Sequence, residues 1–185
     1  MKLRFFTDGG AICPTQPRAR VASWAVIQDI SKSEQQQKQV ADFFLTPSPN
    51  FPLFKVIAVG LVKGQQTAAR GELTAILTAA KIANQSEQAA SVEFVTDAAY
   101  VCAVIALIVC RTFQDKLHRL PNSDLILQLA ALWDSQKFKV RKVKSHRNLD
   151  TAKDLCDLWT IAGNHCADMA ATAVLQNMPQ TLQQI

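Results

Sequence analysis

Short, mostly apolar runs separated by polar or Pro- and Gly-containing stretches recur in the first third of the chain, which predicts strands. Residues 3–10 form a short strand-like run that two glycines end, and residues 21–29 form a second. A third run at 53–62 is rich in β-branched residues, so we interpret all three as strands. The polar stretch after the second run, rich in Gln and Lys, has no apolar period and predicts an exposed excursion or hairpin tip.

Further along the chain the period of the pattern becomes helical, and helices alternate with single strands. We expect helices at 66–83, 98–110, 122–135 and 163–176. We expect strands at 92–96 and 138–144. Consecutive strands pair antiparallel, whereas strands that return through a helix pair parallel. The pattern therefore predicts an α/β fold with a mixed five-stranded sheet, three strands antiparallel and then two parallel, and helices on both faces.

Length and composition indicate one domain with a substantial core. The chain has 185 residues, 49% of them hydrophobic and 19% charged, which excludes a disordered polar chain. We find no internal repeat, so we expect a single domain over residues 1–178 and a frayed polar tail at 179–185. A net charge of +5 permits a polyanionic partner without requiring one.

Cysteine usage and hydropathy bear on the compartment. The five cysteines are odd in number and contain no C-x-x-C spacing, which favours a reducing, intracellular location, cytoplasmic or nuclear. The most apolar run, residues 101–110, is about half the length that a bilayer requires. We therefore expect a buried helix there and no membrane association.

Acidic side chains fall at the junctions of the predicted elements. Asp8 is expected to end the first strand, Asp97 follows the fourth, and Glu72 lies near the start of the first helix. Strand ends and helix starts meet at one edge of an α/β sheet, and Asp168, early in the last helix, could join them. Each carboxylate alone is better read as a cap or a solvated charge. Four together would repel unless a cation lay among them, and oxygen ligands suit Mg²⁺ or Mn²⁺.

Five motifs in a fixed order resemble those of the ribonuclease H family. FTDGGA resembles its first-strand motif, and QTAARGELTAI resembles Q-T-x-x-x-x-E-L-x-A-[LI]. FVTDAAYV is similar to [TS]-D-S-x-Y-V, and VRKVKSHR to the V-K-[GS]-H segment. GNHCADMAA resembles G-N-x-x-A-D-x-[LA]-A. One motif alone would be a weak signal, but the five together cover residues 6–171.

This resemblance implies an endonuclease that hydrolyses the RNA strand of RNA–DNA hybrids with two ions of Mg²⁺ or Mn²⁺. Two such ions can activate a water and stabilise the leaving oxygen in one displacement. The implied metal ligands are Asp8, Glu72, Asp97 and Asp168. His146 would assist proton movement or product release, although a plain surface histidine is the alternative. The implied substrate-binding residues are Gly9, Gly10, Thr67 and Arg70, with Arg111, Lys116 and Arg119 of a basic connector where many members carry a basic protrusion.

A second basic segment spans the last predicted strand and the residues just after it. KFKVRKVKSHR places several Lys and Arg residues within a few positions, where they could contact phosphates or form a solvated strand face. The two readings stay open at this point.

The chain also departs from the family pattern. Ala68 and Ala69 stand where members often carry asparagines that read the minor groove, and a long loop is expected at 145–162. The loop and the early catalytic strand resemble a retroelement-derived ribonuclease H domain, which makes a fused or associated reverse transcriptase a candidate partner. Two alternatives are a non-catalytic nucleic-acid-binding module with the same fold and another ribonuclease-H-like nuclease, such as a transposase or Holliday-junction resolvase. Loss of a carboxylate would favour the module, and none is lost; the glutamate helix motif and V-K-S-H argue against the other nucleases.

Overall fold

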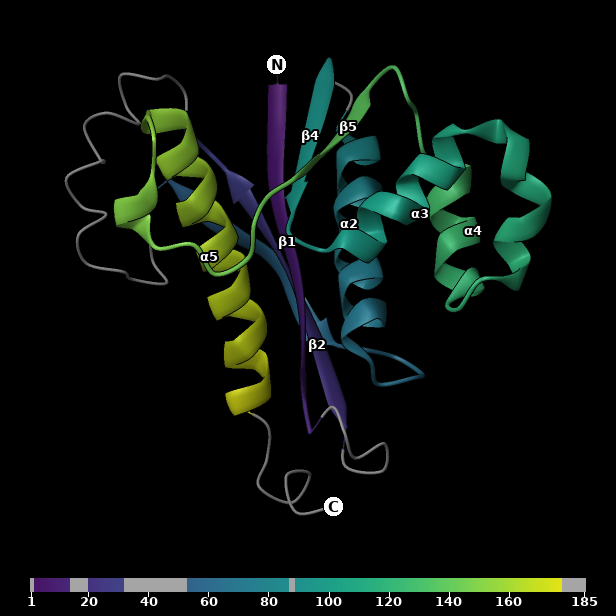
Figure 1. Ribbon diagram of the computed structural model, residues 1–185, viewed down its shortest axis with the longest axis horizontal. Coiled ribbons are helices and arrows are strands. Elements are labelled where there is room, and N and C mark those ends of the chain that lie inside the picture. The colour runs from purple at the N-terminus through teal and green to yellow at the C-terminus, as the bar shows by residue number, and fades with distance from the viewer. Residues whose placement is uncertain (1, 14–19, 32–52, 87–88, 178–185) are drawn as a thin grey trace.

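A five-stranded mixed sheet forms the centre of the computed structural model, which describes residues 2–13, 20–31, 53–86 and 89–177. The strands are β1 (Lys2–Ile12), β2 (Val21–Asp29), β3 (Phe54–Leu61), β4 (Ser91–Thr96) and β5 (Phe138–Lys142). Their order across the sheet is β3-β2-β1-β4-β5 (Figure 1). β1, β2 and β3 pair antiparallel, and β4 and β5 join in parallel, which confirms the predicted topology.

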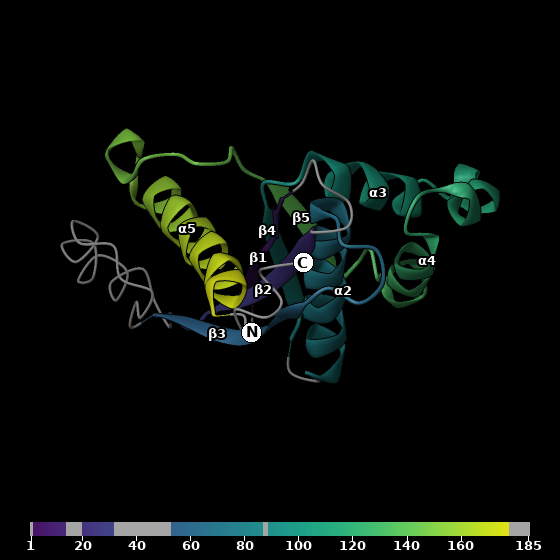
Figure 2. The same cartoon turned by 90° about the horizontal axis from the view of Figure 1, so that it is seen from below.

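Helices cover both faces of the sheet, as the sequence predicted. The α-helices are α2 (Ala68–Gln85), α3 (Ala99–Val109), α4 (Ser123–Leu132) and α5 (Leu155–Gln176). Two 3-10 helices, η2 (Arg111–Arg119) and η3 (Leu149–Thr151), lie between them. α5 packs on one face against β1, β2 and β3, whereas α2 lies on the other face with α3 and α4 beyond it (Figures 1 and 2).

Neighbouring residues of β1 supply the two halves of the core. Side chains alternate across a strand, so Phe5 and Phe6 point to opposite faces. Phe5 lies 6.1 Å from Phe94, ring centroid to centroid, in the cluster under α2. Phe6 packs edge-on against Phe54 at 5.5 Å in the cluster under α5, which also contains the fully buried Trp159. The central strand is therefore buried on both sides.

The prediction that two glycines end the first strand is wrong. β1 continues to Ile12, and Asp8 pairs with Ala25 of β2 in its middle. The antiparallel partner β2 accompanies β1 along its whole second half and supplies the hydrogen bonds that hold it extended. On the other side, the parallel pairing with β4 stops at Phe6 and Val95. Asp8 therefore lies where the sheet opens on one side of a continuous strand.

The long loop predicted at 145–162 is also wrong in its second half. α5 begins at Leu155, with Asp154 as its N-cap, so residues 155–162 form two helical turns before the expected start. The Asp154 side chain accepts a hydrogen bond from the Asp157 backbone N–H at 2.7 Å. The helix begins at this cap, so Gly163, the first residue of the predicted helix, lies buried within α5 instead.

Smaller differences concern element ends. The basic connector forms η2, the third predicted helix ends at Leu132, and β5 ends at Lys142. The polar excursion after β2 and the tail at 179–185 lie outside the described residues. No helix in the described part of the chain combines the length and apolar character needed to cross a membrane.

Candidate active site

Three carboxylates from separate elements meet at the open side of β1. Asp8 comes from β1, Glu72 from the second turn of α2, and Asp97 directly follows β4. One oxygen of each lies within 4.8 Å of the others. Asp8 and Glu72 are buried and Asp97 is half-buried. The pairing of β4 with β1 ends just before this point, so the chain turns away and leaves Asp97 beside Asp8.

The start of α2 is held so that Glu72 faces the sheet. Thr67 is the N-cap, and its hydroxyl accepts a hydrogen bond from the Arg70 backbone N–H at 3.2 Å. The Gln66 side chain accepts from the Ala22 backbone N–H of the sheet at 2.9 Å and donates to the Val62 carbonyl at 2.7 Å. The loop before α2 is thereby tied to β2.

The electrostatics of this cluster favour protonation in the absence of a cation. Burial, with repulsion from Asp97 and Asp168, raises the pKa of Asp8 from 3.8 to about 6. Burial, with repulsion from Asp8 and Asp97, raises the pKa of Glu72 to about 10. The Gly9 backbone N–H donates to both carboxyls and opposes these shifts. Such a set of negative charges requires a proton or a cation for neutralisation.

The donor atoms fit a divalent cation. Oε2 of Glu72 is buried and has no hydrogen-bond partner among the described residues. A buried oxygen without a partner is costly, and metal coordination would satisfy it. The three side chains offer only oxygen, which suits Mg²⁺ or Mn²⁺ better than zinc. Asp8, Glu72 and Asp97 are therefore the residues that would hold such an ion.

Among the described residues, the close cluster contains Asp8, Glu72 and Asp97, and Asp168 lies beside it. It is half-buried on α5 and lines a cleft of about 220 Å³ together with Asp97. One turn earlier, buried Asn164 donates from Nδ2 to Oδ2 of Asp97 at 3.4 Å. The sequence analysis did not single out Asn164, although the G-N of the last motif was a signal for it.

The same cleft collects basic groups and the predicted histidine. Arg141, Lys142 and Lys144 line it beside Asp97, as does exposed His146. His165 lines it from α5. The second basic segment thus faces the acidic site with part of its charge, rather than only solvent.

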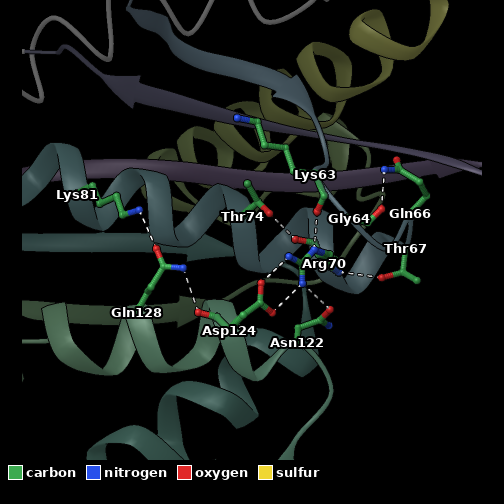
Figure 3. A network of polar contacts seen from close by, with 10 residues as sticks. All are labelled: Lys63, Gly64, Gln66, Thr67, Arg70, Thr74, Lys81, Asn122, Asp124 and Gln128. Carbon is green, nitrogen blue, oxygen red and sulfur yellow. Dashed lines mark hydrogen bonds and ion pairs between the residues drawn. The ribbon is translucent and has the colours of Figure 1, made fainter. Parts of the chain in front are cut away.

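Two predicted substrate-binding residues, Arg70 and Thr67, are engaged within the protein. The Arg70 guanidinium donates from Nη1 to Oδ1 of Asp124 at 2.8 Å, and Nη2 bonds the other carboxylate oxygen (Figure 3). Its Nε donates to the Lys63 carbonyl at 2.7 Å, and Nη1 approaches Oδ1 of Asn122 at 3.3 Å. Arg70 therefore links α2 to α4, and Thr67 caps α2. Their contact with substrate remains a prediction.

The remaining predicted residues are dispersed. Gly9 and Gly10 follow Asp8 within β1. Lys116 and Arg119 are exposed on η2, next to α3 and α4 and on the far side of the molecule from α5 (Figure 1). The side chain of Arg111 lies outside the described part of the structure.

Comparisons with known proteins agree with this architecture. Prototype foamy virus protease–reverse transcriptase has a similar fold, with a TM-score of 0.66 at 19% identity over 96% of this chain. A foamy viral protease–reverse transcriptase in complex with RNA/DNA hybrid gives a TM-score of 0.57 at 16% identity over 95% of this chain. This chain spans 21% and 20% of those two chains. LC9-RNase H1, described as a type 1 RNase H with the type 2 active-site motif, gives 0.56 at 13% identity, covering 96% of this chain and 74% of that one.

The sequence itself carries the family assignment. A search of curated proteins returned no significant match. The family model for RNase H, however, matches residues 1–176. Because that match covers nearly the whole sequence and the fold agrees with it, the chain belongs to the ribonuclease H family.

Proposed function

We propose that the chain is a metal-dependent endonuclease that hydrolyses the RNA strand of RNA–DNA hybrids. The observation that carries this proposal is the cluster of Asp8, Glu72 and Asp97, whose oxygens lie within 4.8 Å of one another in a member of the ribonuclease H family. A non-catalytic binding module would have no need for buried carboxylates that raise one another's pKa.

We infer that the site takes two ions of Mg²⁺ or Mn²⁺, with Asp168 as a fourth ligand beside the cluster of three. When bound, such ions supply an activated water and charge stabilisation at the phosphate. Asp8, Glu72 and Asp97 would hold them, and Asn164 keeps Asp97 in place through its hydrogen bond at 3.4 Å. Asp168 and Asp97 line the same cleft.

The other residues of the cleft have roles that do not depend on the ions. Arg141, Lys142 and Lys144 line it beside the carboxylates and can neutralise phosphates of the hybrid. His146 lies at the same cleft and can accept or deliver a proton at the scissile linkage. Positioning and charge neutralisation are the main demands of phosphodiester cleavage, and this cleft offers both.

We also propose a fused or associated reverse transcriptase as partner. The fold resembles part of a foamy virus protease–reverse transcriptase, of which this chain spans about a fifth. Exposed Ala68 and half-buried Ala69 at the start of α2 offer no side-chain hydrogen bonds to a hybrid. A partner would supply the missing affinity.

A cleavage panel tests the function. RNA–DNA hybrid, double-stranded RNA and double-stranded DNA of one sequence are each incubated with the protein, with and without Mg²⁺. We expect cleavage of the RNA strand of the hybrid only, and only with the metal. Hybrid binding without cleavage under all metal conditions would instead support the non-catalytic module.

A further inference from the structure

The two helical turns that extend α5 at its N-terminus carry an ion pair to the loop that bears His146. Nη1 of Arg147 lies 2.6 Å from Oδ1 of Asp157, and Nη2 lies 2.9 Å from Oδ2. Two parallel hydrogen bonds between a guanidinium and a carboxylate fix orientation as well as distance. Both side chains are mostly shielded, with exposed fractions of 23% and 19%.

Further hydrogen bonds join the whole loop to this pair. Nη2 of Arg147 also donates to the Thr151 carbonyl at 2.8 Å, and the Lys153 backbone N–H donates to Oδ2 of Asp157 at 3.0 Å. Asp154 caps the helix by accepting from the Asp157 backbone N–H. Arg147 and Asp157 therefore hold residues 147–157 as one hydrogen-bonded unit, which we call the Arg147–Asp157 anchor.

His146 precedes this anchor directly and has an unusual backbone. Its φ is 49°, in the left-handed region that non-glycine residues seldom adopt. Such a conformation persists only where the surroundings enforce it. The anchor begins at the next residue, and His146, Arg147 and Asp157 line the same cleft as Asp97 and Asp168.

We propose that Asp157 and Arg147 are positioning residues that hold His146 at the carboxylate cleft. The proposal rests on the hydrolase function proposed above and deepens it. The extended α5 supplies a fixed point for a loop that would otherwise have to order itself in each turnover. The anchor acts through His146, so its removal cannot lower turnover by more than the loss of His146 itself.

Two variants remove the anchor from its two ends. Asp157→Asn keeps the shape and the acceptor for Lys153, while Arg147→Lys keeps the charge and leaves α5 untouched. Each should lower kcat about threefold to tenfold with KM changed less than twofold, since the ordered loop is populated less often. His146→Ala should lower kcat by about 10²-fold or less. Glu93→Gln is the matched control, because Glu93 lies within β4, before Asp97, and pairs with Arg4 at 2.8 Å.

The decisive experiment is a double-mutant cycle on hybrid cleavage, with amide hydrogen exchange of residues 145–154 measured on the same proteins. We expect both anchor variants to accelerate exchange in this segment and Glu93→Gln to leave it unchanged. In the His146→Ala background, Asp157→Asn should lower kcat no further. If Asp157→Asn lowers kcat equally with and without His146, or if kcat is unchanged in both anchor variants, the positioning role of Arg147 and Asp157 is wrong. Hybrid cleavage by the wild-type protein would still support the proposed function in that case. A wild-type protein that cleaves no hybrid would instead reject the proposed function itself.

Discussion

Gly9 of β1 and Gly71 of α2 pack backbone against backbone beside the carboxylate cluster. A Cβ on Gly71 would lie 3.3 Å from the Gly9 Cα and 2.5 Å from the Ser23 carbonyl oxygen. A Cβ on Gly9 would lie 2.3 Å from the Glu72 backbone nitrogen. Only glycine permits so close an approach of a helix to a strand. The contact brings Glu72 within reach of Asp8, one residue before Gly9.

Alanine at Gly9 or Gly71 should therefore separate α2 from β1. Both neighbours are backbone, which cannot rotate away, so we expect a loss of about 1–3 kcal/mol in the free energy of unfolding and a marked loss of Mg²⁺ affinity. Thermal unfolding and metal titration check this. Gly10→Ala is the stability control, since its Cβ would meet only side-chain atoms at 3.5 Å or more. Equal unfolding temperatures for all three variants would show that the contact is dispensable.

Asp8→Asn should raise the stability of the metal-free protein at neutral pH. The folded pKa of Asp8 is about 6, above the ordinary value of 3.8, so the folded state binds its proton more tightly. The stabilisation of the folded protein by this proton is fully present below pH about 4 and is lost as the pH rises through about 6. Without metal, the free energy of unfolding of Asp8→Asn should exceed that of wild type by on the order of 2 kcal/mol at pH 7.5 and by little at pH 4.

Unfolding curves at the two pH values, with and without Mg²⁺, measure this effect. Bound metal should reverse the ranking at pH 7.5, because the wild-type carboxylate then has a cation as partner. A variant that is less stable than wild type at pH 7.5 without metal would contradict repulsion within the cluster.

The exposed cations of η2 test the predicted basic protrusion. If Lys116 and Arg119 contact phosphates, changing both to Ala should weaken hybrid binding and flatten its salt dependence. Each lost contact should reduce the log–log slope by somewhat under one unit. Lys81→Ala is the control for the loss of one positive charge, to be compared with each single change at Lys116 and Arg119; exposed Lys81 donates to Gln128 at 3.1 Å. A slope that matches the control would place η2 away from the substrate.

Asparagine at positions 68 and 69 tests the departure from the family pattern. The start of α2 would then offer the amides that members often use, and each good hydrogen bond contributes roughly 0.5–1.5 kcal/mol. Ala68→Asn with Ala69→Asn should lower KM on short hybrids by about one decade, with a smaller effect on kcat. A titration of hybrid cleavage that gives an unchanged or raised KM would contradict this view.

Sequence patterns could predict the topology because the strands are short apolar runs and because the helix with Glu72 has a clear apolar stripe. They could not predict that β1 continues past Gly9, since the hydrogen bonds that keep it extended come from β2. The early start of α5 depends on the Asp154 cap, which was not recognised within the stretch predicted as a loop. The family resemblance implied a substrate role for Arg70, which stays a prediction. Its pairing with Asp124 could not be predicted, because the two residues are 54 positions apart in sequence and no local pattern applies at that separation.

The central claim is that Asp8, Glu72 and Asp97 form the catalytic metal site, and single-turnover cleavage of RNA–DNA hybrid by Asp97→Asn tests it most directly. Glu93→Gln serves as control, since it removes a carboxylate of β4, the strand that Asp97 follows, and this carboxylate pairs with Arg4 at 2.8 Å. We predict no detectable cleavage by Asp97→Asn across a Mg²⁺ titration, and wild-type rates for the control. The metal-free thermal stability of Asp97→Asn should be no lower than that of wild type, because the change relieves repulsion within the cluster. Wild-type rates for Asp97→Asn would contradict the assignment.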